Sequence, residues 1–262
     1  MKLECRHISK IFGEGVKATR ALDDISFEIG EGEFLCVLGP SGCGKSTLLR
    51  IIAGLLDPSG GDVIYSGNNT GKPENSMVFQ EHGVFPWMNV IDNVAFGLEM
   101  RGFSRNERYE RSLDFLKRVG LAGYAKRNPH ELSVGMRQRI AIARAFVNDP
   151  EILLMDEPFG SLDAQTRLIL QAELLKIWSD HKKTVIFVTH DIDEAILLGD
   201  RVLVMTRTPG KIREVITVGI SRPRELQIEN TQEFVDIRMK IWNSIRSEVE
   251  QSMTGDRYEA EY

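Results

Sequence analysis

EFLCVLGPSGCGKSTLLRIIAGLL, residues 33–56, places an apolar run, a glycine-rich turn and an apolar helix pattern directly one after another. The continuous apolar run before Gly39 predicts a strand that is buried on both faces, as parallel strands are. The glycines of GPSGCGKS, Gly39–Ser46, let backbone N–H groups turn inward around a phosphate at the start of the helix. A strand, loop and helix in this order predict a phosphate-binding site in an α/β fold.

Individual positions of this loop have expected roles. Lys45 reaches the terminal phosphates, Ser46 Oγ binds a magnesium ion, and Thr47 adds a phosphate contact from the first turn of the helix. The alternative is a chance glycine-rich turn, and the flanking strand and helix patterns count against it. The residues predicted to bind the nucleotide here are Gly39, Pro40, Ser41, Gly42, Cys43, Gly44, Lys45, Ser46 and Thr47.

A second buried-strand pattern, Ile152–Asp156, leads into two adjacent acids. We expect Asp156 to bind the magnesium ion and Glu157 to orient and deprotonate an attacking water. A helix cap before Pro158 is the alternative role for this pair, but two carboxylates behind an apolar run are costly without a cation. The pair therefore predicts hydrolysis of the bound nucleotide.

Composition narrows the class of protein. The 262 residues leave room for one large domain or a domain with an inserted lobe, and a 42% hydrophobic content suffices for a core. A formal charge of −5 gives no basic field for nucleic acid, which we exclude as a partner. No apolar run approaches the roughly 20 residues of a membrane-spanning helix, and no secretory signal begins the chain. Three cysteines without a CxxC pair fit a reducing compartment. We therefore expect a cytosolic protein that meets a membrane only through another protein.

The order of patterns predicts a core with an inserted lobe. Residues 2–38 have strand patterns, whereas the stretch from 86 to 148 is helical, with Ser104 and Glu107 as a capping box. Strand and helix patterns then alternate, which is typical of a parallel α/β sheet with its catalytic loops at the carboxyl ends of the strands.

The end of the chain predicts one more helix. Asn230 with Glu233 is a capping pattern, and 254–262 resembles a solvated tail. We expect the helix to pack on its own domain, with a partner-binding role as the alternative. Its apolar stripe consists of Phe234, Ile237, Ile241, Ile245 and Val249.

The segment LSVGMRQR, Leu132–Arg139, narrows the class further, because it opens a basic helix about one helix before the acidic pair. With the two motifs above, the chain resembles the ATPases of ATP-binding cassette (ABC) transporters. The resemblance implies ATP and Mg²⁺ as cofactors, Gln80 as a contact to magnesium and the attacking water, and His190 as the switch histidine on the terminal phosphate. It also implies that Phe12 stacks on adenine; a place in the core is the alternative for that ring.

The resemblance covers nearly the whole chain and implies a P-loop core of the ABC type, with a mixed sheet, flanking helices, an N-terminal antiparallel portion and an inserted helical lobe. The expected domains are a nucleotide-binding core over 1–85 and 151–230, a helical lobe over 86–150, and a C-terminal helix and tail over 231–262.

The same resemblance implies a dimer. Ser133 and Gly135 lie at a helix N-terminus, an anion site that in this family serves the nucleotide of a second subunit. One phosphate loop and one such segment per chain then require two copies, head to tail, with Asp163 in the loop that crosses the two-fold axis. Val134 departs from the family's usual glycine, and a positive φ at that position would strain it.

Two further stretches, 82–98 and 206–212 (TRTPGKI), resemble the nitrate, sulfonate and taurine importer branch. In that branch the residues around Phe85–Met88 receive a helix of a membrane permease, and packing within the lobe is the alternative for these aromatics. The chain would then lie on the cytoplasmic face of the inner membrane and act indirectly with a solute-binding protein. An exporter or lipid-transport ATPase, or a soluble ABC ATPase without a transport role, remains the alternative function.

Overall fold

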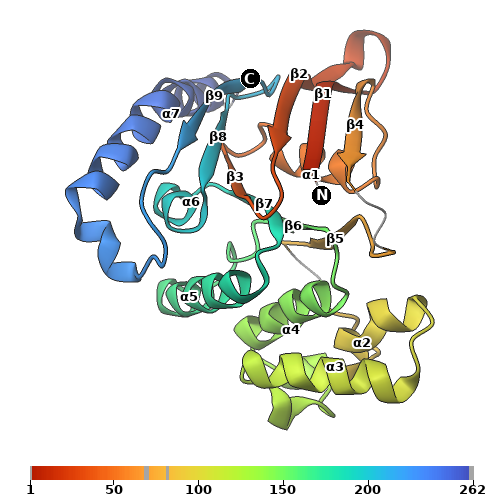
Figure 1. Cartoon of the computed structure of the whole chain (residues 1–262). Helices are drawn as coiled ribbons and strands as arrows, with labels where there is room; N and C mark the ends of the chain where they lie inside the picture. Colours follow the sequence, from red (N-terminus) through yellow and green to blue (C-terminus); the bar gives the residue numbers. More distant parts are fainter. Residues whose placement is uncertain (1, 68–70, 81–82, 260–262) are drawn as a thin grey trace. The chain divides into compact units, whose positions relative to one another are not determined.

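The computed structural model describes residues 2–67, 71–80 and 83–259, which form two compact units (Figure 1). The first unit combines Met1–Asn68 with Thr184–Tyr262, and the second is the continuous stretch Asn69–Lys183. The helices predicted over 86–148 lie inside the second unit, which also contains two strands and one further helix.

Two sheets organise the first unit. In one, β1 pairs antiparallel with β2 and with β4; in the other, β3 lies between β7 and β8 in parallel, and β9 closes the edge antiparallel to β8. Strand β9 was absent from our predictions, because only one of its six side chains is buried. The strands are β1 Lys2–Phe12, β2 Thr19–Ile29, β3 Phe34–Leu38, β4 Gly60–Ser66, β7 Thr184–Thr189, β8 Arg201–Met205 and β9 Ile212–Thr217.

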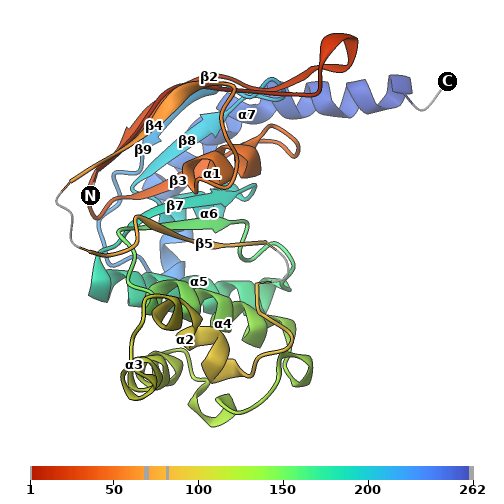
Figure 2. The same cartoon turned by 90° about the vertical axis from the view of Figure 1, so that its right-hand side faces the viewer.

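In the part of this unit that the structure describes, three α-helices accompany these sheets. Helix α1 contacts both β7 and β2, so it packs between the two sheets (Figure 2). Helix α6 packs on β3, β7 and β8, and α7 packs on β8, β9 and α6. The helical segments are η1 Gly15–Lys17, α1 Lys45–Ile52, α6 Ile192–Leu198, η4 Leu226–Asn230 and α7 Gln232–Glu259.

The C-terminal helix differs from its prediction at both ends. Asn230 ends η4, and Thr231 Oγ1 instead accepts the N–H of Phe234, the position of a helix cap. The stretch expected as a solvated tail continues the helix as far as Glu259. Phe234, Ile241 and Ile245 are buried, so the apolar stripe packs on its own unit, while the side chain of Val249 lies outside the described residues.

Over its described residues, 71–80 and 83–183, the second unit combines a parallel strand pair with four α-helices. Strand β5 pairs with β6 from Asn75↔Ile152 to Val78↔Met155. Helix α2 contacts both α3 and α4, and the rings of Phe115 and Phe146 stack between α3 and α4 at 5.6 Å. The elements are β5 Asn75–Val78, α2 Val90–Met100, α3 Arg105–Arg118, η2 Ala122–Tyr124, η3 Pro129–Glu131, α4 Val134–Val147, β6 Ile152–Asp156 and α5 Ala164–His181.

Side-chain caps begin the helices of this unit. Asn89, Ser104, Ser133 and Asp163 each accept a hydrogen bond from the backbone N–H three residues further on, before α2, α3, α4 and α5. Such caps satisfy donors that a helix leaves without an intrahelical partner. The sequence therefore fixes where these helices begin, and with them the loops that precede them.

Candidate nucleotide site

The glycine-rich loop lies between β3 and α1, as its sequence predicts. Gly42 and Gly44 have φ of +75° and +98°, which residues with a side chain rarely adopt. Gly44 caps α1 without a side-chain hydrogen bond. The helix therefore begins with its N-terminal dipole at the loop, an arrangement that favours an anion such as phosphate.

Lys45, the first residue of α1, is 5% exposed. Its Nζ donates to the carbonyl oxygens of Gly39 and Pro40, at 2.8 and 3.0 Å. The ammonium thus lies at the first two residues of the loop. Ser46 and Thr47 follow in the first helical turn and are half-buried.

His190 follows the carboxyl end of β7, and the loop follows the carboxyl end of β3. These strands are parallel neighbours, and Leu38 is paired with Thr189, so the two segments start side by side. The loop after β7 is held by a buried carboxylate, since Thr189 Oγ1 donates to Glu194 and also accepts the N–H of Asp191 at 3.0 Å. His190 itself is exposed.

In the second unit, Gln80 and the acidic pair come together. Gln80 lies just beyond β5 and Glu157 just beyond β6, and Gln80 Nε2 donates to Glu157 Oε2 at 3.5 Å. Asp156, the last residue of β6, is 3% exposed. The parallel pairing of β5 with β6 is what brings these residues to one edge of the pair.

Glu157 has an unusual backbone. Its φ is +41°, the left-handed region, which costs a residue with a side chain about 1–3 kcal/mol and is found most often at functional sites. Asp156 and Glu157 are adjacent in sequence, yet one ends a strand and the other leaves it in a different direction. No local sequence pattern predicts the positive φ of Glu157.

Ser133, Gly135 and Asp163 lie at the neighbouring N-termini of α4 and α5. Ser133 Oγ accepts the N–H of Met136, and Asp163 Oδ1 accepts the N–H of Thr166, which holds the pKa of Asp163 below its usual value. A Cβ on Gly135 would lie only 3.0 Å from Thr166 Cγ2, so the two helix starts are in close contact.

Val134 shows none of the strain considered above. It is the first residue of α4 and does not belong to the residues with positive φ. Its side chain is 47% exposed, so the β-branched residue is accommodated by pointing its bulk to the surface of the unit.

Phe12, the candidate for adenine stacking, is 43% exposed at the end of β1. The alternative, an aromatic residue of the core, is therefore wrong. Lys10 Nζ lies 5.3 Å from the ring centroid, which adds a positive charge beside the aromatic face.

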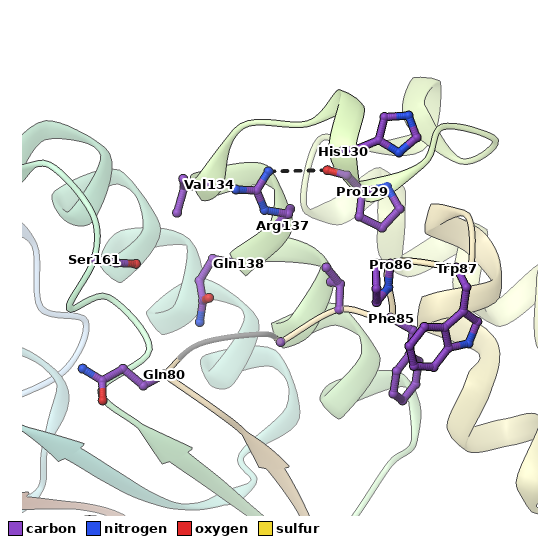
Figure 3. A pocket seen from close by; sticks show the side chains of 12 residues that line it. Gln80, Phe85, Pro86, Trp87, Pro129, His130, Val134, Arg137, Gln138 and Ser161 are labelled. Atoms are coloured by element: carbon purple, nitrogen blue, oxygen red, sulfur yellow. Dashed lines mark hydrogen bonds between the residues drawn. The ribbon is translucent and has the colours of Figure 1, made fainter.

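A pocket of about 750 Å³ opens in the second unit, and Gln80 and Ser161 are among the residues that line it (Figure 3). Its lining combines Phe85, Pro86 and Trp87 with Val134, and Gln138 projects into it from α4. Trp87 is 74% exposed, whereas Phe85 packs edge-on against Phe96 at 4.8 Å. Phe85 thus packs within the lobe, and Trp87 faces outward.

Asn93 lies beneath this surface, and the sequence analysis missed it. It is fully buried on α2, and its side chain accepts from Phe85 N at 2.7 Å and donates to Phe85 O and Met88 O at 3.1 and 3.0 Å. One amide thus fixes the turn that carries Pro86 and Trp87. A polar residue in an otherwise apolar helix stripe is the signal that points to it.

Each residue predicted to bind magnesium carries an oxygen donor of the kind that the ion prefers. Mg²⁺ prefers hard oxygen ligands and takes one or two carboxylates alongside phosphates and water. Asp156 offers one buried carboxylate at the end of β6, and Ser46 and Gln80 offer a hydroxyl and an amide oxygen. Among the described residues, no cluster of three His, Cys, Asp or Glu side chains that could hold a metal ion is present.

Comparison with known proteins assigns the chain to a family. The model of the ABC transporter family matches residues 22–160. The chain belongs to the ABC transporter family. It is an ATP-binding cassette ATPase of mixed α/β fold, as its motifs predicted.

Relatives are similar over nearly the full chain. An uncharacterised ABC transporter ATP-binding protein of Methanocaldococcus jannaschii is 51% identical over 97% of this chain and 94% of its own. An aliphatic sulfonates import ATP-binding protein of Bacillus cereus is 44% identical over 92% of this chain and 94% of its own.

A solved structure agrees with the fold of this cassette. A dimeric ATP-binding cassette in a post-hydrolysis state with ADP and Pi has a TM-score of 0.73 and 32% identity, and covers 84% of this chain and 100% of that one. Within the described part of this ABC ATPase, no helix has the length and apolar character needed to cross a membrane.

Proposed function

We propose that the chain is the ATPase subunit of an importer that takes up a small solute such as nitrate, a sulfonate or taurine through a separate membrane permease. The observation that carries this proposal is the exposed apolar turn at the mouth of the pocket, with Trp87 74% exposed on a scaffold fixed by Asn93. A large aromatic held outward by a buried polar residue is suited to binding a partner. The 44% identity to a sulfonate import ATPase supports the class of solute.

The roles proposed for the site follow its chemistry. The loop Gly39–Ser46 binds the phosphates of ATP, Lys45 leaves its two carbonyl acceptors for the terminal phosphates, and Phe12 stacks on the adenine. Glu157 takes the proton of the attacking water, which Gln80 and His190 help to place. Magnesium, when bound through Ser46, Gln80 and Asp156, supplies charge neutralisation at the phosphates.

The working unit in this proposal is a homodimer. Ser133 and Gly135, at the start of α4, complete the nucleotide site of a second copy, and Asp163 lies in the loop that links the two sites. Two observations support it: the start of α4 is exposed at Ser133 and Val134, and the solved cassette of similar fold is dimeric. ATP closes the two copies, and hydrolysis reopens them.

The docking surface for the permease is the pocket behind Trp87. Gln138 is 8% exposed and lines the pocket, and its Nε2 has no hydrogen-bond acceptor among the described residues. The permease segment is therefore expected to place apolar side chains against Phe85 and Trp87. The chain would be a peripheral protein of the inner membrane through this contact.

Co-purification tests the docking proposal. A tagged chain is isolated from detergent-solubilised membranes, and the integral membrane protein that it retains is quantified for Trp87→Ala and for Trp242→Ala. Trp242 is a second exposed tryptophan, 41% exposed on α7, and therefore a matched control. We expect Trp87→Ala to lose the membrane protein about tenfold or more, as for a central aromatic of an interface, and Trp242→Ala to retain it.

Uptake assays test the direction and the solute. Proteoliposomes that contain the recovered complex are measured for ATP-dependent movement of labelled taurine, a sulfonate and nitrate in both directions. If the complex is retained but the labelled solute moves only away from the cytosolic side, the chain belongs to an exporter. Equal loss of the membrane protein in both tryptophan variants would show that the pocket is not its docking site.

A further inference from the structure

The segment TRTPGKI, which the ATP site does not explain, forms the tight turn between β8 and β9. Thr206 and Lys211 close this turn: Thr206 N donates to Lys211 O at 2.9 Å, and Lys211 N donates to Thr206 Oγ1 at 3.0 Å. These two hydrogen bonds join the two ends of the turn.

Thr208, at the tip of this turn, contacts the phosphate loop. Its Oγ1 donates to the carbonyl oxygen of Gly42 at 2.7 Å, across 166 positions of sequence. Gly42 has a φ of +75° and is exposed, so its own local structure restrains this carbonyl weakly. The hydroxyl of Thr208 supplies a restraint from outside the loop.

The hydrogen bond from Thr208 also sets the direction of the Cys43 N–H, because the peptide group is planar. The Gly42 carbonyl and the Cys43 N–H belong to one trans peptide, so they point in opposite directions. With the carbonyl held by Thr208, the Cys43 N–H points back into the loop, where it donates to Pro40 O at 3.4 Å. Rotation of this peptide would instead turn a carbonyl oxygen toward the phosphates.

Gly210 holds the next peptide of the loop by close approach. A Cβ on Gly210 would lie 2.1 Å from the carbonyl oxygen of Cys43, so only glycine fits there. Gly210 is fixed in turn on β2, because its N–H donates to Ala21 O at 2.9 Å and its carbonyl accepts the N–H of Asp23 at 3.0 Å. Two successive peptides of the phosphate loop are thus supported by one turn.

We propose that the β8–β9 turn holds the phosphate loop in its binding conformation and that Thr208 is its positioning residue, acting on ATP through the Gly42–Cys43 peptide. The proposal rests on the phosphate site assigned above. Loss of the hydroxyl leaves the peptide free to rotate, which weakens the binding of phosphates but leaves the groups that carry out hydrolysis unchanged.

Steady-state kinetics of the purified chain with four variants test this role. Thr208→Val keeps the shape but removes the hydroxyl, Thr208→Ala removes both hydroxyl and methyl, and Thr208→Ser keeps the hydroxyl. Thr217→Val, at the other end of β9, removes an exposed hydroxyl as a control. We expect Thr208→Val and Thr208→Ala to raise the KM for ATP about three- to tenfold, the range of one lost hydrogen bond. We expect the kcat of these two variants to stay within about twofold of the wild-type value. The KM and kcat of Thr208→Ser and Thr217→Val are expected to equal those of wild type.

A Lys45→Ala variant separates failure of this inference from failure of the phosphate site. If Lys45→Ala abolishes ATP binding but Thr208→Val has the KM of wild type, the positioning role is wrong and the phosphate site stands. If Lys45→Ala binds ATP like wild type, the phosphate site itself is wrong. A failure of Thr208→Ser to restore the KM would also overturn the role of the hydroxyl.

Discussion

Glu157 and Lys45 show how single residues are prepared for their proposed roles. Glu157 is held at a φ of +41° and receives a hydrogen bond from Gln80, so its carboxylate is placed at a backbone cost. Lys45 is held by two carbonyl groups of the loop that it serves. Glu157 thus lies beside Gln80 before a nucleotide binds, whereas Lys45 would exchange its two carbonyl acceptors for the phosphates.

At this scale we predict that Glu157→Gln lowers ATP hydrolysis by roughly two to four orders of magnitude, the usual contribution of a general base. The amide keeps the shape and the contact to Gln80 but cannot accept the proton of water. Phosphate release measures the effect, and ATP affinity is expected to persist. Glu151→Gln, at the other end of β6, is the control and should hydrolyse ATP like wild type. Near-normal turnover in Glu157→Gln would remove this residue as the base.

Close contacts between helices, strands and turns set the positions of the loops that carry functional residues. Helix α2 reaches the end of α4 where a Cβ on Gly97 would lie 2.7 Å from Asn148 Oδ1. The β8–β9 turn reaches β2 through an ion pair of Lys211 with Asp23 at 2.8 Å, and Arg20 donates to the same carboxylate at 2.7 Å. Contacts of this kind set the positions of loops that the elements themselves do not contain.

For α2 we predict that Gly97→Ala destabilises the chain by about 1–3 kcal/mol, the usual cost of overpacking. At an open position in a helix the same change would stabilise by about 1 kcal/mol. Unfolding in urea measures the difference in the free energy of unfolding between Gly97→Ala and wild type. Gly123→Ala is the control, because an added Cβ there meets nothing within 4 Å. A midpoint for Gly97→Ala at or above wild type would show that α2 and α4 separate easily.

For the β8–β9 turn we predict a dependence of stability on pH. The hydrogen bond from Lys211, followed by that from Arg20, holds the pKa of Asp23 below its usual value. Since the folded pKa is depressed, the stabilisation is present above the unfolded value of about 3.9 and is lost as the pH falls through the folded pKa.

Unfolding of wild type and Asp23→Asn, from about pH 6 down to pH 2, measures this contribution. The gap between the two midpoints should be constant above about pH 5 and should shrink below about pH 4. A gap that widens as the pH falls would contradict the predicted role of the ion pair.

At the scale of the whole molecule, the proposed head-to-tail dimer makes each ATP site depend on two chains. Lys45→Ala removes the loop side of a site, and Ser133→Arg blocks the side contributed by α4, where Ser133 is exposed. Each variant alone then has two defective sites per dimer. A mixed dimer has one intact site, because both defects fall together in the other.

We therefore predict that an equimolar mixture of Lys45→Ala and Ser133→Arg recovers ATP hydrolysis above the sum of the separate variants. If the intact sites act independently, random pairing gives about a quarter of the wild-type rate, since half of the dimers are mixed. The two variants are mixed under native conditions until their subunits have exchanged, and phosphate release then measures the rate of ATP hydrolysis. A mixture that is no more active than its parts, alongside wild-type chain that exchanges normally, would argue against shared sites.

Much of the fold was predictable from sequence because its signals are local. The apolar runs of β3 and β6 and the caps of α3 and α4 each depend on neighbouring residues. The same holds for the glycines that admit positive φ in the phosphate loop. The family assignment followed from these motifs and their order, and comparison with relatives confirmed it.

Other features depended on residues far apart in the chain. Strand β9 is stabilised by β8 rather than by its own pattern, the helix expected to begin at Asn230 is capped by Thr231, and the exposure of Phe12 is set by the sheet around it. Sequence alone determined the chemistry of this protein, because a few residue types in fixed order suffice for a phosphate loop and an acidic pair. Only the tertiary structure decided which distant groups hold those residues in place, as Thr208 holds Gly42, because such contacts arise from packing and leave no local pattern.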